Sequence, residues 1–240
     1  MRLDKFLADC GLGSRKDIKK MISKGLVTVN GTVCKTAQTA VDEGDEVYCG
    51  GKKINYEKFI YLMMNKPQGY ISATEDKHKK TVLDLLGEEY KYFTLFPAGR
   101  LDIDTEGFLL LTNDGNFAHN ILSPKKHVDK TYFAEINGEI TSEHIKMFEN
   151  GITLEDGYKT LPSTLKILKS GEKSQVEITV CEGKFHQIKR MFEAIGTHVV
   201  YLKRIAMGNL FLDENLKKGE VKKLTKEETE KIIGGKNGHN

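Results

Sequence analysis

Acidic side chains are concentrated in one short segment, residues 98–107, which lies between a proline turn at Pro97 and an apolar run. Asp102, Asp104 and Glu106 stand at alternate positions of this segment. Loops that carry such charge beside a rigid strand are frequent active-site positions. A carboxylate there could bind a metal, act in a pair on a glycosidic bond, or attack an electrophilic carbon alone.

Two of these three chemistries fit the residues poorly. A calcium loop beginning at Asp102 would have Glu106 at its fifth position and Asn113 at its twelfth, where a bidentate Glu is needed. A paired-carboxylate hydrolase would need Asp102 to cooperate with Asp104 or Glu106, and we expect Asp102 and Asp104 to point to opposite faces of an extended segment. A lone attacking carboxylate, Asp102, fits better.

Basic residues are concentrated in a second segment, residues 182–192, where a strand ending at Cys181 is expected to meet a glycine turn and then a helix. A lysine there could pair with Asp102, hold it ionised and orient it. A cationic helix start without a chemical role is the alternative. The chain contains no Gly-x-Ser-x-Gly, GxxxxGK[ST] or GxGxxG sequence, so serine hydrolysis and nucleotide-driven chemistry have no support.

Composition sets broad limits on the protein class. The chain has 240 residues, with 37 Lys plus Arg against 34 Asp plus Glu, so it is only mildly basic and permits a nucleic-acid partner without requiring one. No signal peptide is evident, and the longest apolar run, 108–111, is far too short to span a bilayer. A cytoplasmic protein is therefore expected. Its four cysteines form no CxxC pair and are expected to be reduced thiols: Cys10, Cys34, Cys49 and Cys181.

The first fifty residues have the pattern of a small unit. Apolar spacing predicts a helix over 2–9, and Ser14 with an acid three residues later predicts the start of a second helix that ends at Gly25. Asn30-Gly31 between two β-branched pairs predicts a type I′ hairpin. The second helix is strongly basic, which indicates either a solvated face or contacts with an RNA backbone. Its basic residues are Arg15, Lys16, Lys19, Lys20 and Lys24.

A polar linker over 50–59 is expected to lead into a larger region. Strands and helices there alternate irregularly, which favours an α+β domain with a largely antiparallel sheet. The expected strands are 59–64, 70–72, 108–112, 131–136, 165–168 and 175–180, and the expected helices are 81–86, 142–150, 187–195 and 225–233. Residues 234–240 are expected to form a disordered tail.

These segments, taken together, resemble a known family. Residues 99–115 resemble the signature of the pseudouridine synthases, and three further segments agree in the same order: Met64–Tyr70, Lys130–Tyr132 and Glu182–Phe192. The first fifty residues resemble an S4 RNA-binding module of α-L type, as in one branch of that family. The departures are small, because Lys184 stands where Arg is common and Ile188 where Val is common.

The resemblance implies a reaction and the residues that perform it. Uridine would be isomerised to pseudouridine after the base leaves its stack, with no cofactor, nucleotide or metal. Asp102 would attack the sugar or trigger glycal formation, and Lys189 would be its charged partner. Tyr132 would stack on the flipped uracil and is a candidate for handling the C5 proton. Ile188 would form an apolar wall, and Arg100 would fill the gap left by the base.

The resemblance also implies an organisation and a partner. We expect an S4 domain over 1–50, a linker over 51–59, a catalytic domain over 60–233 whose sheet floors the RNA cleft, and a tail over 234–240. The expected partner is ribosomal RNA or a ribosomal subunit assembly intermediate, with 16S rRNA favoured over 23S rRNA, and the protein is expected to be a monomer. The rival interpretation is a non-catalytic S4 ribosome-binding factor.

Overall fold

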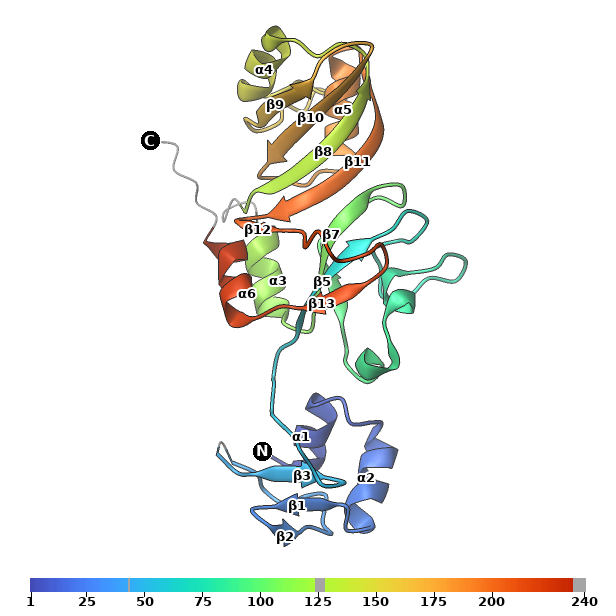
Figure 1. Ribbon diagram of the computed structural model, residues 1–240, viewed down its shortest axis with the longest axis vertical. Coiled ribbons are helices and arrows are strands. Elements are labelled where there is room, and N and C mark those ends of the chain that lie inside the picture. Colours follow the sequence, from blue (N-terminus) through green and yellow to red (C-terminus); the bar gives the residue numbers. More distant parts are fainter. Residues whose placement is uncertain (43, 124–127, 235–240) are drawn as a thin grey trace. The chain divides into compact units, whose positions relative to one another are not determined.

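The computed structural model describes residues 1–42, 44–123 and 128–234, and the tail expected over 234–240 lies almost entirely outside them. The chain divides into two compact units. The first comprises Met1–Ile60 and Leu86–Leu95, and the second comprises Tyr61–Leu85 and Phe96–Asn240 (Figure 1). Within the described residues, no helix is long and apolar enough to cross a membrane.

The first unit packs two helices on a small antiparallel sheet. Its elements are α1 (Leu3–Asp9), α2 (Arg15–Ser23), β1 (Val27–Val29), β2 (Thr32–Val33), β3 (Val47–Cys49) and β4 (Lys52–Lys53), with strand order β2-β1-β3-β4, and the 3₁₀ turn η2 (Glu88–Tyr90). Leu3, Leu7 and Ile18 are fully buried in its core. The hairpin prediction is confirmed, because Asn30 and Gly31 both have positive φ between paired strands, as a type I′ turn requires.

Local contacts explain the start of α2 and the fold of the segment that follows β3. Ser14 caps α2, and its hydroxyl accepts a hydrogen bond from the Asp17 N–H, which confirms the predicted helix start. The segment expected to be a linker is partly ordered into the unit, which corrects that expectation. Lys52 and Lys53 pair with β3, and the Tyr56 ring stacks on Phe6 at 5.2 Å between ring centroids.

The second unit is built on one nine-stranded sheet. Its strands are β5 (Tyr61–Lys66), β6 (Phe96–Ala98), β7 (Glu106–Thr112), β8 (Lys130–Asn137), β9 (Thr164–Lys169), β10 (Lys173–Val180), β11 (His198–Met207), β12 (Leu210–Phe211) and β13 (Val221–Lys223). The main path runs β13-β5-β7-β11-β8-β10-β9, and every pair is antiparallel except β7 with β11. The α+β class with a largely antiparallel sheet is thus confirmed.

Helices close the two halves of this sheet. They are α3 (Gly115–Leu122), α4 (Ser142–Glu149), α5 (Gln187–Ala194), α6 (Lys226–Ile233) and the 3₁₀ turn η1 (Val82–Leu85). Apolar side chains of α3 and α6 pack into one buried cluster with β5 and β7 (Figure 1). At the other half, α4 and α5 meet through Phe148 and Phe192, whose ring centroids lie 5.0 Å apart.

The sequence patterns missed one central strand and one helix. β11 lies between β7 and β8, but its buried face includes Arg204, and a charged residue conceals the apolar alternation that marks a strand. The helix α3 is short and begins at the side-chain cap Asp114. Residues 70–72, expected to be a strand, form only an isolated bridge between Ile71 and Thr81.

Candidate active site

The most acidic segment of the chain forms a tight turn rather than a strand. The Thr105 N–H donates to the Asp102 carbonyl at 3.1 Å, and β7 begins at Glu106. Gly99 lies between β6 and this turn, and its φ of +92° lets the backbone change direction there. Residues 101–105 therefore project from the start of β7, whose seven residues are all buried. A short turn on a rigid strand holds its side chains in fixed directions.

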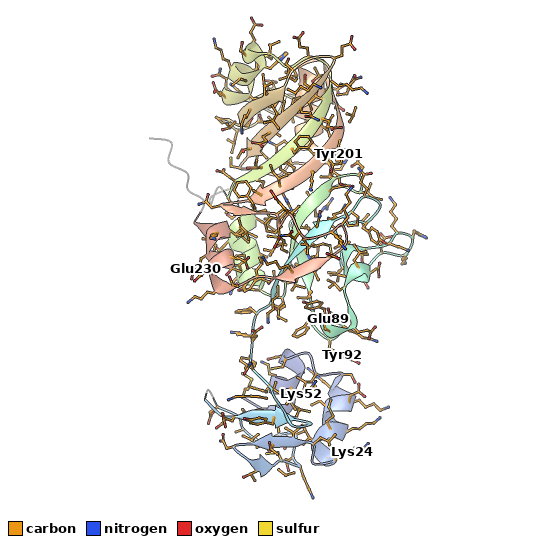
Figure 2. The ribbon with its side chains drawn as sticks, viewed as in Figure 1. Lys24, Lys52, Glu89, Tyr92, Tyr201 and Glu230 are labelled. Carbon is orange, nitrogen blue, oxygen red and sulfur yellow. The ribbon has the colours of Figure 1, made fainter. Side chains whose placement is uncertain are left out.

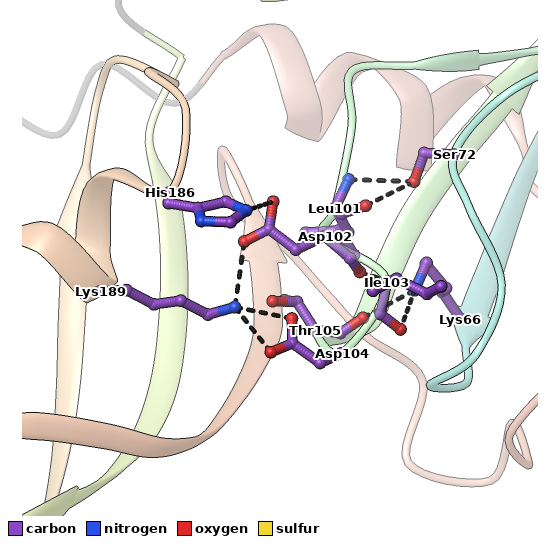
Figure 3. A network of polar contacts seen from close by, with 9 residues as sticks. All are labelled: Lys66, Ser72, Leu101, Asp102, Ile103, Asp104, Thr105, His186 and Lys189. Carbon is purple, nitrogen blue, oxygen red and sulfur yellow. Dashed lines mark hydrogen bonds and ion pairs between the residues drawn. The ribbon is translucent and has the colours of Figure 1, made fainter.

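A buried lysine, Lys66, binds the backbone carbonyls of this turn. Lys66, fully buried at the end of β5, donates its ammonium protons to the carbonyls of Asp102 at 3.0 Å, Thr105 at 2.9 Å and Pro67 at 3.1 Å (Figure 3). Burial lowers the pKa of Lys66 to about 8. The Ser72 hydroxyl binds the first residue of the turn. It accepts a hydrogen bond from the Leu101 N–H and donates one to the Leu101 carbonyl, each at 3.0 Å.

Two basic side chains face the Asp102 carboxylate from the start of α5. Lys189 Nζ lies 3.3 Å from Oδ2, and His186 Nε2 lies 3.6 Å from Oδ1 (Figure 3). The Lys189 side chain is only 17% exposed, so water screens this pair weakly. A nearby ammonium favours the ionised carboxylate, which is the form that can act as a nucleophile.

Asp104 shares the same lysine. Lys189 Nζ donates to its two carboxylate oxygens at 2.6 and 2.8 Å. Partial burial alone would raise the pKa of Asp104, but the hydrogen bonds and charge of Lys189 outweigh it, and the pKa lies below its usual value. The expectation that Asp102 and Asp104 point to opposite faces is wrong. Side chains two apart on a strand share a face, and these two residues lie in a turn from which both carboxylates reach Lys189.

A cavity opens beside Asp102, and most of the predicted site residues line it. Tyr132 and Ile188 are buried in its wall, and Arg100 is exposed at its edge. Val180 and Leu202 add apolar surface. The lining combines two carboxylates, Asp102 and Glu182, with the basic side chains of His186 and Lys189 and an apolar wall, which suits a flat, partly apolar ring brought next to a nucleophile.

A buried guanidinium lies behind Tyr132. Arg204 is 2% exposed, and its Nε donates to the Phe108 carbonyl at 2.6 Å while Nη1 donates to the Tyr132 hydroxyl at 3.5 Å. Its Nη2 has no hydrogen-bond partner within the described residues. A cation there stabilises negative charge that develops on the Tyr132 oxygen.

A buried carboxylate fixes the loop that carries the two facing cations. Glu182 accepts from the Tyr158 hydroxyl at 2.7 Å and from the Gln187 side-chain amide at 2.7 Å. Gln187 in turn accepts from the Lys184 N–H at 3.0 Å, so the loop is tied at both ends. His186 has φ of +49°, an uncommon conformation for a residue with a side chain, and it serves as the N-cap of α5.

The four basic residues expected to bind RNA lie in the first unit. They are Arg15, Lys16, Lys19 and Lys20, all exposed on α2. Lys24 follows the same helix and is exposed as well (Figure 2). None of them lines the cavity beside Asp102.

Comparison with known protein families identifies the chain. A family model described as RNA pseudouridylate synthase matches residues 60–194, and a model of the S4 domain matches residues 1–47. The chain belongs to the RNA pseudouridine synthase family. As such it is an isomerase with an S4 RNA-binding domain at its N-terminal end.

Relatives of this pseudouridine synthase cover nearly its whole length. The uncharacterized RNA pseudouridine synthase YtzG of Bacillus subtilis is 51% identical over 95% of this chain and 96% of its own. Ribosomal large subunit pseudouridine synthase B of B. subtilis is 39% identical (96% and 95%), and ribosomal small subunit pseudouridine synthase A of Escherichia coli is 38% identical (97% and 100%). A crystal structure of a pseudouridylate synthase superposes with a TM-score of 0.68 at 36% identity, over 97% and 99% of the chains.

Several residues of the pseudouridine synthase site had no role in the sequence interpretation. Lys66 lies in the segment Met64–Tyr70, which was noticed only as a motif. His186 lies in the basic segment 182–192, and its spacing to Lys189 could have placed both on one side of a helix start. Ser72 and Arg204 carry no such signal, because Ser72 reaches the turn through a hydroxyl contact with Leu101 and Arg204 reaches Tyr132 through the pairing of β11 with β8.

Proposed function

We propose that this pseudouridine synthase isomerises a specific uridine of ribosomal RNA and that Asp102 is its nucleophile. The contact of Asp102 with Lys189 at 3.3 Å on the wall of a partly apolar cavity carries the proposal. The reaction breaks the bond between N1 of uracil and C1′ of ribose and forms a bond from C5 to C1′. The C5 proton leaves and N1 gains a proton, so no atom is added.

Each lining residue has a part in this reaction. Lys189 pairs with Asp102 and sets the direction of its carboxylate, and Asp102 either attacks C1′ or promotes elimination to a glycal. Tyr132 stacks on the flipped uracil, and its hydroxyl, next to Arg204, is placed to handle the C5 proton. Ile188 packs on the edge of the base, and Arg100 takes the space that the base leaves in the RNA.

The first experiment is release of tritium from RNA labelled at C5 of uridine. Asp102→Asn keeps the shape of the side chain but cannot act as a nucleophile, so tritium release should fall by roughly a thousandfold or more. Asp156→Asn is the matched control, because Asp156 also pairs with a basic residue of α5, Arg190, outside the Asp102 contact. Wild-type release from Asp102→Asn would refute the assignment. It would also favour the rival role of a non-catalytic S4 ribosome-binding factor.

The RNA target is proposed as 16S rRNA, at a uridine of the 516 type. The likeness to ribosomal small subunit pseudouridine synthase A supports it. A 23S rRNA uridine is the second candidate, because the likeness to ribosomal large subunit pseudouridine synthase B is as strong. Mapping pseudouridines in both rRNAs from cells with and without the gene decides between them, since only the true target loses its pseudouridine.

A further inference from the structure

Two aromatic rings are stacked at the rim of the cavity. Phe185 and His186 lie almost parallel, with ring centroids 3.8 Å apart and 15° between the ring planes. Phe185 is 69% exposed, more than any other large apolar side chain in the described residues. His186 also contacts the Asp102 carboxylate at 3.6 Å. The stacked pair thus connects the proposed nucleophile to an exposed ring.

The loop that carries these rings is held firmly. Glu182 and Gln187 are buried and hydrogen-bonded to each other, and the Lys184 N–H donates to Gln187 just before Phe185. An exposed phenylalanine on a firmly held loop costs free energy in water and contributes nothing to the core. The loop therefore fixes the direction of the Phe185 ring. This favours a role in binding another ring over a role in packing the core.

We propose that the outer face of Phe185 is a stacking site for an unpaired nucleobase next to the target uridine. The inference rests on the proposed function, since a uridine that enters the cavity places its neighbours at the rim. Bases of single-stranded RNA are commonly held by stacking on aromatic side chains. The preceding residue, Lys184, is exposed, with its ammonium 4.9 Å from the centroid of the Tyr158 ring, and it supplies positive charge for the RNA backbone.

The Phe185 site contributes to RNA affinity and takes no part in the reaction. Phe185 has no reactive group, and the Asp102 contacts come from His186 and Lys189. Stacking on one base is typically worth a fivefold to hundredfold change in affinity, about 1–3 kcal/mol. Every base has a π-face, so the site tolerates different neighbouring bases and requires only that the base be unpaired.

Fluorescence tests the site directly, because the chain contains no tryptophan. Phe185→Trp places a single reporter in the proposed stack, and in vitro transcripts of 16S and 23S rRNA are the probes. Phe211→Trp is the matched control, since Phe211 is 66% exposed on β12, none of whose residues lines the cavity, whereas both chain neighbours of Phe185 line it. Emission from the tryptophan at 185 should fall by about half or more as the binding transcript is added, with little change at 211. Equal emission changes at both positions, or none at 185, would overturn the proposal.

Kinetics give the second readout. Phe185→Ala should raise KM for the RNA roughly tenfold and change kcat less than threefold, and Phe185→Tyr should restore KM because it keeps the ring. An unchanged KM in Phe185→Ala overturns the stacking site while tritium release by the wild type still supports the proposed function. If the wild type releases no tritium from either rRNA, the proposed function fails, and quenching confined to 185 still supports a nucleobase site.

Discussion

Buried positive charge distinguishes the site at the level of single residues. Lys66, Lys130 and Arg204 are each at most 6% exposed, and none forms an ion pair within the described part of the chain. They are held mainly by carbonyl oxygens instead. Burial lowers the pKa of both lysines to about 8. The carboxylates of Asp102, Asp104 and Glu106 oppose this lowering at Lys66, so its positive charge is partly offset by the acidic turn that it holds.

The pH dependence of Lys66 gives one prediction. Below pH 8 its ammonium donates to the carbonyls of the 101–105 turn, and above pH 8 it loses a proton and a donor, so kcat should fall as the pH rises from about 8 to 10. Stability should move the other way. Because the unfolded chain keeps this proton to higher pH, the free energy of unfolding from this group increases over the same interval.

Tritium release and chemical denaturation, both measured from pH 7 to 10, check this prediction. Lys66→Met should have a lower kcat, by about tenfold, and should lack the decline above pH 8. A wild-type decline that coincides with loss of folded protein would contradict a local effect on the turn.

Replacement by Asn should lower kcat less at Asp104 than at Asp102. Asp104→Asn removes the carboxylate that holds Lys189 but leaves the nucleophile, so we expect a loss in kcat of about tenfold rather than a thousandfold. Single-turnover tritium release at saturating enzyme separates the two variants. If Asp104→Asn is as inactive as Asp102→Asn, the two carboxylates act as one unit.

At the scale of elements, the parallel contact of β7 with β11 decides where the turn lies. Gly107 lies opposite Arg204 in this pairing and has φ of +101°. A Cβ there would lie 2.2 Å from the Arg204 carbonyl oxygen, which is backbone and cannot move aside cheaply. The close approach of the two strands therefore requires glycine.

Gly107→Ala should accordingly destabilise the second unit by about 3 kcal/mol or more. Gly157→Ala is the matched control, because Gly157 also has positive φ (+82°) but has open space around it, so about 1 kcal/mol is expected. Urea unfolding midpoints give both values. Equal losses in the two variants would mean that strain in φ, rather than the strand contact, controls the effect.

At the scale of the whole molecule, the basic helix expected to contact RNA phosphates and the proposed chemistry belong to different units. The basic residues of α2 lie in the first unit, while Asp102 and its neighbours lie in the second. Contacts with phosphates supply affinity that depends on salt and carry little sequence information. The S4 domain is therefore expected to supply affinity that depends on salt, while the second unit supplies the chemistry and the stacking contact at Phe185.

Charge reversal in α2 tests this division. Lys16→Glu, Lys19→Glu and Lys20→Glu together should raise KM for rRNA at least tenfold, leave kcat within about twofold, and flatten the dependence of affinity on salt by about 0.7–0.9 per lost phosphate contact. Lys226→Glu reverses the charge of an exposed lysine at the start of α6 and should alter neither KM nor the dependence of affinity on salt. An unchanged salt slope in the triple variant would remove α2 from the RNA interface.

The sequence by itself determined the elements whose pattern is local. The cap at Ser14, the Asn30-Gly31 hairpin and the helix over 187–195 follow from neighbouring residues, and so does the choice of Asp102 through its family motif. The tertiary structure decided what depends on distant partners. Pairing of β11 with β8 brings Arg204 opposite Tyr132, and Lys66, buried under the turn, holds the backbone from which Asp102 and Asp104 both reach Lys189. Such contacts join residues tens of positions apart, and no periodicity along the chain encodes them.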